Sequence, residues 1–342
     1  METLRLRITA ELESDLSHDP ALLQAAEILR AGGLVAFPTE TVYGLGANAL
    51  DPAALEKIFV AKQRPHWDPV IVHVADVAAA RELTSDWTES AARLAEAFWP
   101  GPLTLLLPRT SAIPDLCTGG RANVGLRLPA HPVARALIAA AGVPVAAPSA
   151  NLFGHTSPTT ADHVLADLDG RIDAVLDAGG CAVGVESTVL DPTVAPPLIY
   201  RPGGVTGEQL RAVLGDVQVA LRNIVDEVPK EALESPGFGI RHYAPRARVV
   251  LVSSESELMQ VLKRETRSNQ VGVLLPYGWR APLVPARVLR CANLNEPDLL
   301  ARDLYSLMRE LDEGGAEVIV CPLPAAEGIG LAIRDRLRKA AQ

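Results

Sequence analysis

Small hydroxyl residues follow several apolar segments of this 342-residue chain. Thr39 and Thr41 come just after the apolar run LVAF, and Ser149 follows PVAA in the sequence APSAN. Ser and Thr at the ends of strands commonly do no more than start turns. In open α/β sheets, however, ligands bind where strands end, so these hydroxyl groups are also candidates for ligand contacts.

Positively charged side chains accompany these hydroxyl groups. In the strand pattern NVGLRL, alternation places Asn123 and Arg127 on one face, and an arginine there suits a carboxylate or a phosphate. Lys62 and Arg64 lie between a helix end and a proline turn, and Arg201 ends the run LIYR. The alternative is that these residues are ordinary solvated surface charges.

Two further residues lie on predicted strands. His73 belongs to the run VIVHV, where a hydrogen-bonded core histidine is the commoner explanation. Ser187 begins the run STVL. Taken together, hydroxyl groups, glycines and several cations suit a small anionic ligand such as a nucleotide. Gly44 and Gly46, just after Thr41, would let the backbone approach that ligand.

The elements that must position these residues follow a mixed α/β order rather than a strict βαβ repeat. The first two helices have Asp–Pro starts, at Asp19 and Asp51. Regularity fades between about 215 and 246 and then returns. The sequence therefore predicts a first domain over 1–215, a linker over 216–246 and a smaller α/β domain over 247–342.

Bulk composition narrows the function classes. The net charge of -9 disfavours a strongly electrostatic binder of RNA or DNA. The four cysteines show no CxxC spacing, which predicts buried free thiols in a reducing cytoplasm. The N-terminal residues lack a signal-peptide pattern, and no apolar run is long enough to span a membrane, so we expect a cytoplasmic protein.

Common catalytic motifs are missing from the sequence. It contains no GxxxxGK[ST] phosphate loop, no GxGxxG after the first strand and no HExxH. Its VESTV and APSAN serines do not form a GxSxG nucleophile elbow. A P-loop nucleotide site and a Ser-His-Asp hydrolase are therefore disfavoured.

A combination of motifs resembles a known family. FPTETVYGLG, KQRPHWDPVIVHV, VGLRLP, PVAAPSANLFGHTSPT, GVESTVLD and IYRPGGVT occur in this order over about residues 20–215. The chain thus resembles the YrdC/Sua5 family, the L-threonylcarbamoyladenylate synthases of tRNA modification. SPGFGIRHYAP and the segment after it resemble the linker and C-terminal domain of the long, two-domain form. The resemblance implies a YrdC-like twisted mixed sheet with flanking helices, plus a smaller Rossmann-like α/β domain.

The resemblance also implies a reaction. Such enzymes combine L-threonine, bicarbonate and ATP into threonylcarbamoyl-AMP and pyrophosphate, which makes them nucleotidyltransferases. Mg²⁺ accompanies the ATP, and neither a metal held by protein ligands alone nor a redox cofactor is expected. A downstream threonylcarbamoyl transferase complex completes the t6A modification, so contact with tRNA is at most indirect.

Roles carry over by motif position. Lys62 and Arg64 would be catalytic, binding the ATP phosphates and helping to orient the bicarbonate. The expected L-threonine contacts are Thr41, His73, Arg127, Ala147 and Ser187. The expected ATP contacts are Thr39, Lys62, Arg64, Asp68, Asn123, Ser149, Asn151, Ser157, Arg201, His242 and Tyr243.

Three features stay open at the level of sequence. Asp68 stands where the family commonly has Asn or His, and its carboxylate would repel phosphates unless it faces Mg²⁺ or a basic neighbour. In the linker, Phe238, Gly239 and Ile240 depart from the usual motif, which leaves a lid role open. By alternation Glu40 points away from both threonines, which favours a structural salt bridge.

Two other functions are compatible with parts of the sequence. The first is an RNA-binding YrdC module without synthase activity, since a concave positive face can dock RNA. The second is a carbamoyl-transfer module, but the acylphosphatase and zinc-finger segments of the related carbamoyltransferases are missing from this sequence.

Overall fold

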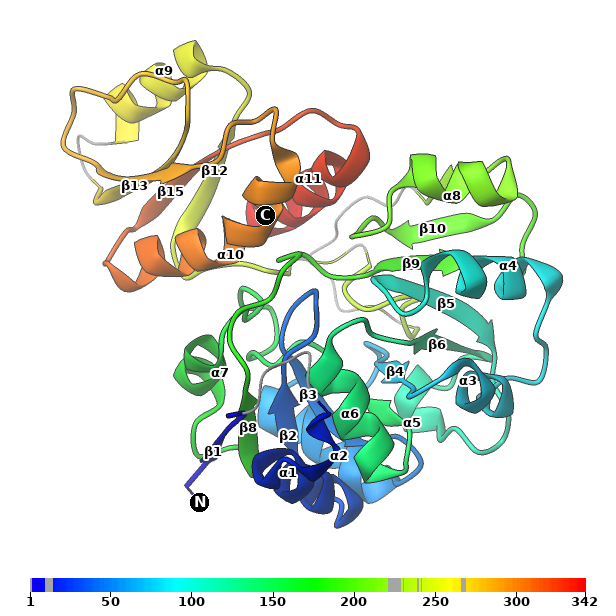
Figure 1. Cartoon of the computed structure of the whole chain (residues 1–342). Helices are drawn as coiled ribbons and strands as arrows, with labels where there is room; N and C mark the ends of the chain where they lie inside the picture. Colours follow the sequence, from blue (N-terminus) through cyan, green and yellow to red (C-terminus); the bar gives the residue numbers. More distant parts are fainter. Residues whose placement is uncertain are drawn as a thin grey trace.

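The computed structural model describes residues 2–9, 15–220, 229, 231–238, 240, 242–265 and 269–342. These residues form two α/β bodies, each built around its own sheet (Figure 1). The predicted linker lies partly outside the described residues, as does Gly239 of its SPGFGIRHYAP motif. No described helix is long and apolar enough to cross a membrane.

The large sheet has eleven strands, and it mixes parallel and antiparallel neighbours, which confirms the predicted class. Its order is β1-β8-β2-β3-β7-β4-β6-β5-β9-β10-β11. The strands are β1 (Leu4–Arg7), β2 (Val35–Phe37), β3 (Gly44–Asn48), β4 (Ile71–His73), β5 (Leu103–Pro108), β6 (Asn123–Arg127), β7 (Val145–Ala146), β8 (Ala174–Asp177), β9 (Thr188–Asp191), β10 (Leu198–Arg201) and β11 (Gln218–Val219). β11 lies within the predicted linker and extends this sheet by pairing with β10.

The helices of this body begin as the sequence predicts. Asp19 and Asp51 accept hydrogen bonds from backbone N–H groups in the first turns of α1 and α2, and a proline follows each of them. The helices are η1 (a 3₁₀ turn, Leu16–His18), α1 (Pro20–Arg30), α2 (Pro52–Lys62), α3 (Val77–Leu83), α4 (Glu89–Phe98), α5 (Asp115–Thr118), α6 (Pro132–Ala141), α7 (Ala161–Leu168) and α8 (Gly207–Leu214).

Alternate residues of β2 show that helices cover both faces of the large sheet. Val35 and Phe37 pack with apolar residues of α1 and α6. Ala36, between them, belongs to the core cluster that includes α2, α4 and α7. Successive side chains of a strand point to opposite faces, so the ends of the strands are the places left open for a ligand.

The second body has a four-stranded, all-parallel sheet in the order β12-β15-β13-β14. Its strands are β12 (Arg248–Val252), β13 (Val271–Pro276), β14 (Arg287–Cys291) and β15 (Val318–Pro322). Its helices are α9 (Glu255–Glu265), α10 (Pro297–Glu313) and α11 (Gly328–Ala340). α10 and α11 pack on one face and α9 on the other, which is the doubly covered arrangement of a Rossmann-like sheet. α10 and α11 lie on the side toward the large sheet (Figure 1).

One strand runs through a stretch that the sequence analysis treated as the wall of a pocket. Gly44 and Gly46 belong to β3, which pairs antiparallel with β2. A Cβ on Gly46 would lie 2.8 Å from the Phe37 ring and 2.9 Å from the Val145 side chain. Gly46 therefore serves the packing of the strand, and the prediction that it opens the backbone to a ligand is wrong.

The cysteines match their prediction. Cys117, Cys181, Cys291 and Cys321 are all free and buried. Burial raises the pKa of the Cys117 thiol to about 12, so this thiol stays protonated near neutral pH. These side chains are small apolar core residues rather than nucleophiles.

Candidate active site

A small cavity lies where several strands of the large sheet end. The β2–β3 turn, β4, β6, β10 and the segments beside β7 and β9 line it. Pro236, His242 and Tyr243 of the linker segment also line it. Its volume is about 50 Å³, whereas pockets for drug-sized ligands measure roughly 300–1,000 Å³. An ATP-sized ligand therefore fits only if lining residues move apart.

Most of the predicted site residues meet in this cavity. They are Thr39, Thr41, Arg64, His73, Arg127, Ala147, Ser149, Ser187, Arg201, His242 and Tyr243. Their sequence positions span more than 200 residues, so only the fold brings them together. Their individual ligand roles stay predictions.

The other predicted residues lie beside the cavity rather than in its lining. Asn123 lines a separate cavity of about 10 Å³. Lys62, Asp68, Asn151 and Ser157 are buried, and their side chains hydrogen-bond or ion-pair with neighbouring protein groups. These four residues lie beside the cavity, where their bonds hold neighbouring protein groups.

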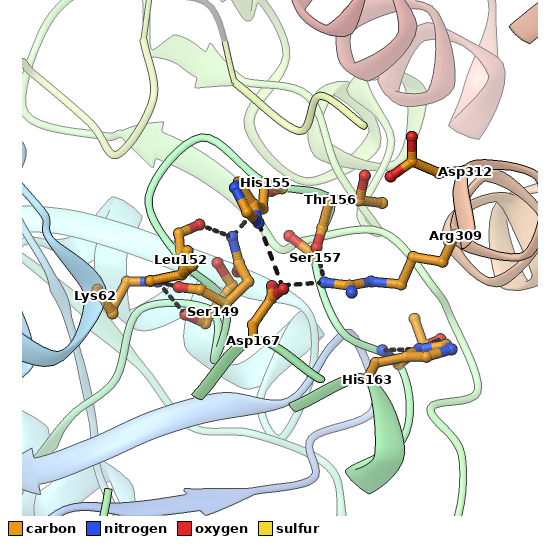
Figure 2. A network of polar contacts seen from close by, with 12 residues as sticks. Lys62, Ser149, Leu152, His155, Thr156, Ser157, His163, Asp167, Arg309 and Asp312 are labelled. Atoms are coloured by element: carbon orange, nitrogen blue, oxygen red, sulfur yellow. Dashed lines mark hydrogen bonds and ion pairs between the residues drawn. The ribbon is translucent and has the colours of Figure 1, made fainter. Parts of the chain in front are cut away.

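A larger cavity of about 510 Å³ lies between residues 152–156, α7 and α10. Its described lining contains charged residues of both signs, including Arg309, Asp167 and Asp312, and none of the predicted site residues (Figure 2). Arg309 donates a hydrogen bond to Asp167 at 2.9 Å, so its charge is already balanced by the protein. The smaller cavity, where cations face hydroxyl groups, is therefore the better candidate for the site.

Thr39 shapes the β2–β3 turn. Its Oγ1 accepts hydrogen bonds from the backbone N–H groups of Thr41 and Val42, at 3.1 and 3.2 Å. It also lies 2.7 Å from the carbonyl oxygen of Val42, to which it donates. With its hydroxyl group occupied in this way, Thr39 holds the turn that presents Thr41.

Arg127 connects two residues of the same turn. Its Nη2 donates to Glu40 Oε1 at 2.7 Å and to Thr41 Oγ1 at 2.9 Å, and its Nε donates to the Gly101 carbonyl at 3.3 Å. The predicted ion pair of Glu40 is thus confirmed. The prediction that Glu40 points away from both threonines is wrong, since one guanidinium nitrogen bridges Glu40 and Thr41. Burial raises the pKa of Glu40, but the Arg127 charge and hydrogen bonds outweigh it and lower the pKa overall.

His73 lies next to Arg127 because β4 and β6 are paired in register. Burial, followed by the nearby Arg127 charge, lowers the pKa of His73 to about 3. Its imidazole is therefore neutral near pH 7, and its buried Nδ1 has no hydrogen-bond partner among the described residues. A neutral ring beside a cation suits an uncharged polar group of a ligand.

Ser187 and Arg201 form another part of the lining. Arg201 Nη2 donates to Ser187 Oγ at 3.1 Å, and its Nε donates to the Ser187 carbonyl at the same distance. The Thr104 hydroxyl lies 2.8 Å from Ser187 Oγ. The antiparallel pairing of β9 and β10 brings these residues together. Arg201 is buried, so its charge acts at close range on anything in the cavity.

Lys62 holds the loop that carries Ser149. Its Nζ donates to the carbonyl oxygen of Ser149 (Figure 2). It also donates to the carbonyl oxygen of Asn151. Asn151 Nδ2 in turn donates to the carbonyls of Leu152 and His155, at 2.7 and 2.9 Å. Burial, and then the Arg64 charge, lowers the pKa of Lys62 well below its usual value. In this arrangement Lys62 fixes the loop backbone instead of pointing into the cavity.

The structure supplies the basic neighbour that Asp68 needs. Arg64 Nη2 lies 2.9 Å from Asp68 Oδ2, and Arg64 also donates to the carbonyls of Asp68 and Pro69. Asp68 Oδ1 accepts the backbone N–H of Gly237 at 3.0 Å. One buried carboxylate therefore joins the phosphate-binding candidate Arg64 to the linker.

Aromatic contacts hold the linker against the cavity. The His242 ring lies 5.5 Å from the Phe153 ring and 4.2 Å from the Tyr243 ring. Tyr243 has φ 63°, a left-handed backbone conformation that few residues other than glycine adopt. Such a conformation persists only when the surroundings hold it, so Tyr243 is fixed by its neighbours.

Comparison with known proteins gives the family. The family model Sua5_yciO_yrdC, described as "Telomere recombination", matches residues 27–203. A second model, "Threonylcarbamoyl-AMP synthase, C-terminal domain", matches residues 205–342. This chain belongs to the Sua5/YciO/YrdC family. The resemblance drawn from the motifs is therefore confirmed, including the long two-domain form.

Relatives of this Sua5-family chain match it over nearly its whole length. It is 43% identical to the threonylcarbamoyl-AMP synthase of Bacillus subtilis over 337 residues, 98% of this chain and 96% of that protein. The threonylcarbamoyl-AMP synthase of Pyrococcus abyssi is 41% identical and matches 92% of each chain. The crystal structure of P. abyssi Sua5 complexed with L-threonine superposes with a TM-score of 0.89 over 100% of this chain and 98% of that one, at 37% identity.

Sequence reasoning missed one charged residue of this Sua5-family site. Glu186 lines the cavity, and it is 5% exposed. Its Oε1 accepts a hydrogen bond from the Ser157 hydroxyl at 2.6 Å. A signal was available, because a carboxylate directly before the buried strand STVL needs a partner. Its other partners, Tyr305 and Arg336, come from the C-terminal body, which no local pattern indicates.

Proposed function

We propose that this chain is a threonylcarbamoyl-AMP synthase, which makes threonylcarbamoyl-AMP and pyrophosphate from L-threonine, bicarbonate and ATP. Full-length similarity to proteins of that name supports the proposal. The observation that carries it is the cavity, where Arg127 stands beside hydroxyl groups and a neutral histidine while Arg64 and Arg201 supply further positive charge.

The proposed threonine end of the cavity comprises Thr41, His73, Arg127, Ala147 and Ser187. The P. abyssi relative has been solved with L-threonine bound, and we transfer that ligand to this chain. Arg127 is held on one side by Glu40 and Gly101, so its remaining N–H groups suit a carboxylate. The neutral His73 and the Ser187 hydroxyl then suit the amine and hydroxyl groups of threonine.

The proposed nucleotide end comprises Arg64, Ser149, Arg201, His242 and Tyr243. Arg64 and Arg201 would neutralise the phosphates, and the linker residues would cover the nucleotide. ATP must displace the linker to enter, because the closed cavity is too small for it. The described linker residues are thus proposed to act as a lid. Asn123, Asn151 and Ser157 would support the nucleotide from loops and strand ends, as the motif positions imply.

The chemistry needs no protein nucleophile. The threonine amine attacks bicarbonate, and water leaves to give a carbamate. A carbamate oxygen then attacks the α-phosphorus of ATP, and the bond from that phosphorus to the departing pyrophosphate breaks. This is nucleotidyl transfer. The protein contributes by positioning the reactants and by stabilising the charge that develops on the phosphates, the latter through Arg64 and Arg201. Lys62, which the motif position assigns to the phosphates, would act by holding the loop that carries Ser149.

Mg²⁺ would arrive with the ATP phosphates and neutralise them. Among the described residues, no group of three or more His, Cys, Asp or Glu side chains is placed to hold a metal ion. The carboxylate of Asp68 is already bound by Arg64 and by the Gly237 N–H. The donor set therefore fits an ion carried by the nucleotide better than a protein cage. The acceptor of the product would be a downstream transferase complex in the cytoplasm.

Pyrophosphate release tests the proposal. The purified chain with Mg-ATP should release pyrophosphate only when both L-threonine and bicarbonate are present. Release without either co-substrate would overturn the synthase assignment. RNA binding that persists at high salt, together with no pyrophosphate release, would favour the RNA-binding module instead.

A further inference from the structure

The partners of Glu186 come from three segments that are far apart in the sequence. Ser157, in the loop before α7, donates to Oε1. The Tyr305 hydroxyl of α10 lies 3.2 and 3.1 Å from the two carboxylate oxygens. Arg336 of α11 donates from Nε to Oε2 at 2.6 Å. A carboxylate in the wall of the cavity is therefore held mainly by the second body.

The same two residues of the C-terminal body also hold the linker. The Arg336 guanidinium lies 5.0 Å from the centre of the Tyr243 ring. The Tyr305 ring stacks on Tyr243, with centroids 6.1 Å apart and planes 23° apart. These contacts explain how Tyr243 keeps its left-handed backbone conformation. Arg336 and Tyr305 thus touch Glu186 and the proposed lid at once.

Arg336 balances the charge of the buried Glu186 carboxylate. Glu186 is buried, and burial raises its pKa, but Arg336 and then Arg201 lower it enough that the carboxylate is ionised. After Arg336, the next charge that lowers the pKa of Glu186 is that of Arg201, which contacts Ser187. A buried carboxylate left without its partner is strongly unfavourable. Glu186 would then compete with a ligand for the charge of Arg201.

An ionised Glu186 also fixes the hydroxyl of Ser157. A carboxylate only accepts hydrogen bonds, so Ser157 must donate its single proton to Oε1. Ser157 is buried and lies beside the cavity rather than in its lining, so this hydrogen bond holds Glu186 in the cavity wall. Glu186→Gln keeps a side-chain carbonyl oxygen that can accept this hydrogen bond, so removing the charge alone leaves the Ser157 hydroxyl group oriented.

We infer that Arg336 and Tyr305 are positioning residues for the nucleotide end of the site, acting through the ionised Glu186 on Ser157 and Arg201. This inference rests on the proposed function for its choice of ATP as the ligand. It makes the C-terminal body part of the machinery that binds the nucleotide. The threonine end, which rests on Arg127, Glu40 and Thr41, lies outside this chain of contacts.

The test is a double-variant cycle on Arg336 and Glu186. Arg336→Met should weaken ATP binding about tenfold, because it leaves a buried carboxylate unpaired, and should change the KM for L-threonine less than about twofold. Adding Glu186→Gln removes that unpaired charge and should bring ATP affinity back to within about threefold of the wild type. The four proteins of the cycle are compared by titration with Mg-ATP alone and by steady-state kinetics.

A matched control distinguishes a role in positioning the nucleotide end from a role in holding the two α/β bodies together. Arg309→Met breaks another ion pair between the bodies, with Asp167, that does not involve Glu186. It should lower thermal stability without the selective loss of ATP affinity. Tyr305→Phe removes only the hydroxyl group and should weaken ATP binding about threefold, which keeps the test open if Arg336→Met fails to fold.

The outcomes are distinct. The inference would be overturned if Arg336→Met and Arg309→Met each weakened the affinities for ATP and for L-threonine equally. It would also be overturned if the effects of Arg336→Met and Glu186→Gln on ATP affinity were strictly additive. If the wild type binds ATP in an Arg336-dependent way yet releases no pyrophosphate with both co-substrates, the positioning role stands and the proposed function fails.

Discussion

The proposed threonine end and the proposed nucleotide end of the site are built from different kinds of structure. At the threonine end, His73 and Arg127 lie side by side on paired strands, and Arg127 is fixed by Glu40. At the nucleotide end, Ser149 lies on a loop held by Lys62, and His242 and Tyr243 lie on the linker. Ladder hydrogen bonds fix His73 and Arg127, whereas His242 and Tyr243 depend on contacts between separate segments.

This difference predicts that the threonine end is more rigid than the nucleotide end. A side chain on a central strand keeps its position unless the sheet opens, because its backbone is bonded on both sides. His242 and Tyr243 are held by side-chain contacts instead of a strand ladder, and such a segment can move as a unit. The threonine end should therefore be formed before ligands arrive, and the nucleotide end should form as the linker closes. Variants that affect the two ends separately would sharpen this comparison.

The largest effect is expected at Arg127. Arg127→Ala should raise the KM for L-threonine about 100-fold, equivalent to about 2.7 kcal/mol, because a charged hydrogen-bonding partner of the carboxylate is lost. The KM for ATP should change by less than about threefold. Steady-state kinetics with each substrate varied in turn measures the split.

A control is needed because Arg127→Ala also leaves Glu40 buried without its partner. Adding Glu40→Gln removes the unpaired charge and should restore stability without restoring threonine affinity. An equal rise in both KM values in this double variant would contradict the carboxylate role of Arg127 and the separation of the two ends.

A smaller effect is expected where Asp68 joins Arg64 to the linker. Asp68→Ala removes both the ion pair with Arg64 and the acceptor for Gly237, and should weaken ATP binding about tenfold. Asp68→Asn keeps an acceptor for the Gly237 N–H and should lose less. Titration with Mg-ATP compares the two variants, and threonine affinity should stay near that of the wild type in both.

An opposite result would be equally informative. If Asp68→Ala binds ATP more tightly than the wild type, then the Asp68 charge repels the phosphates more than its hydrogen bond to the linker helps. The proposal that the nucleotide end forms as the linker closes would then apply only to the aromatic residues of the linker, His242 and Tyr243.

The sequence was sufficient to predict the class of fold and much of the cavity lining. Strand ends carry period-two patterns, so residues such as Thr41 and Arg127 could be placed at one edge before their neighbours were known. The direction of Lys62 could not be predicted, since it depends on which carbonyl groups the loop after β7 presents. Glu186 was missed because Arg336, its main partner, comes 150 residues later in the chain.

The last expected effects concern pH and again separate the two proposed ends. His73 and His242 are both buried, and burial lowers the pKa of each, to about 3 for His73. Both are neutral in the folded protein at pH 7, whereas in the unfolded chain each takes up a proton near its ordinary pKa of about 6.5. Stability that depends on the neutral ring is therefore full above about pH 6.5 and falls as the pH drops toward the folded pKa.

The two histidines should become protonated through different openings of the structure as the pH falls. His73 lies on a strand, so it is protonated only when the sheet unfolds, and it should lower the free energy of unfolding by about 2 kcal/mol between pH 7 and pH 5. His242 can be protonated when the linker alone opens, and it lies near the charges of Arg64 and Lys62. Acid should therefore weaken ATP binding through His242 before the protein unfolds.

Two substitutions check this assignment. His73→Asn should flatten the pH dependence of the unfolding free energy, measured by denaturant titration between pH 7 and pH 5. His242→Asn should leave that dependence in place and flatten the pH dependence of ATP affinity. If both substitutions flatten the same curve, the linker does not open separately from the sheet, and the two ends of the site respond to acid as one unit.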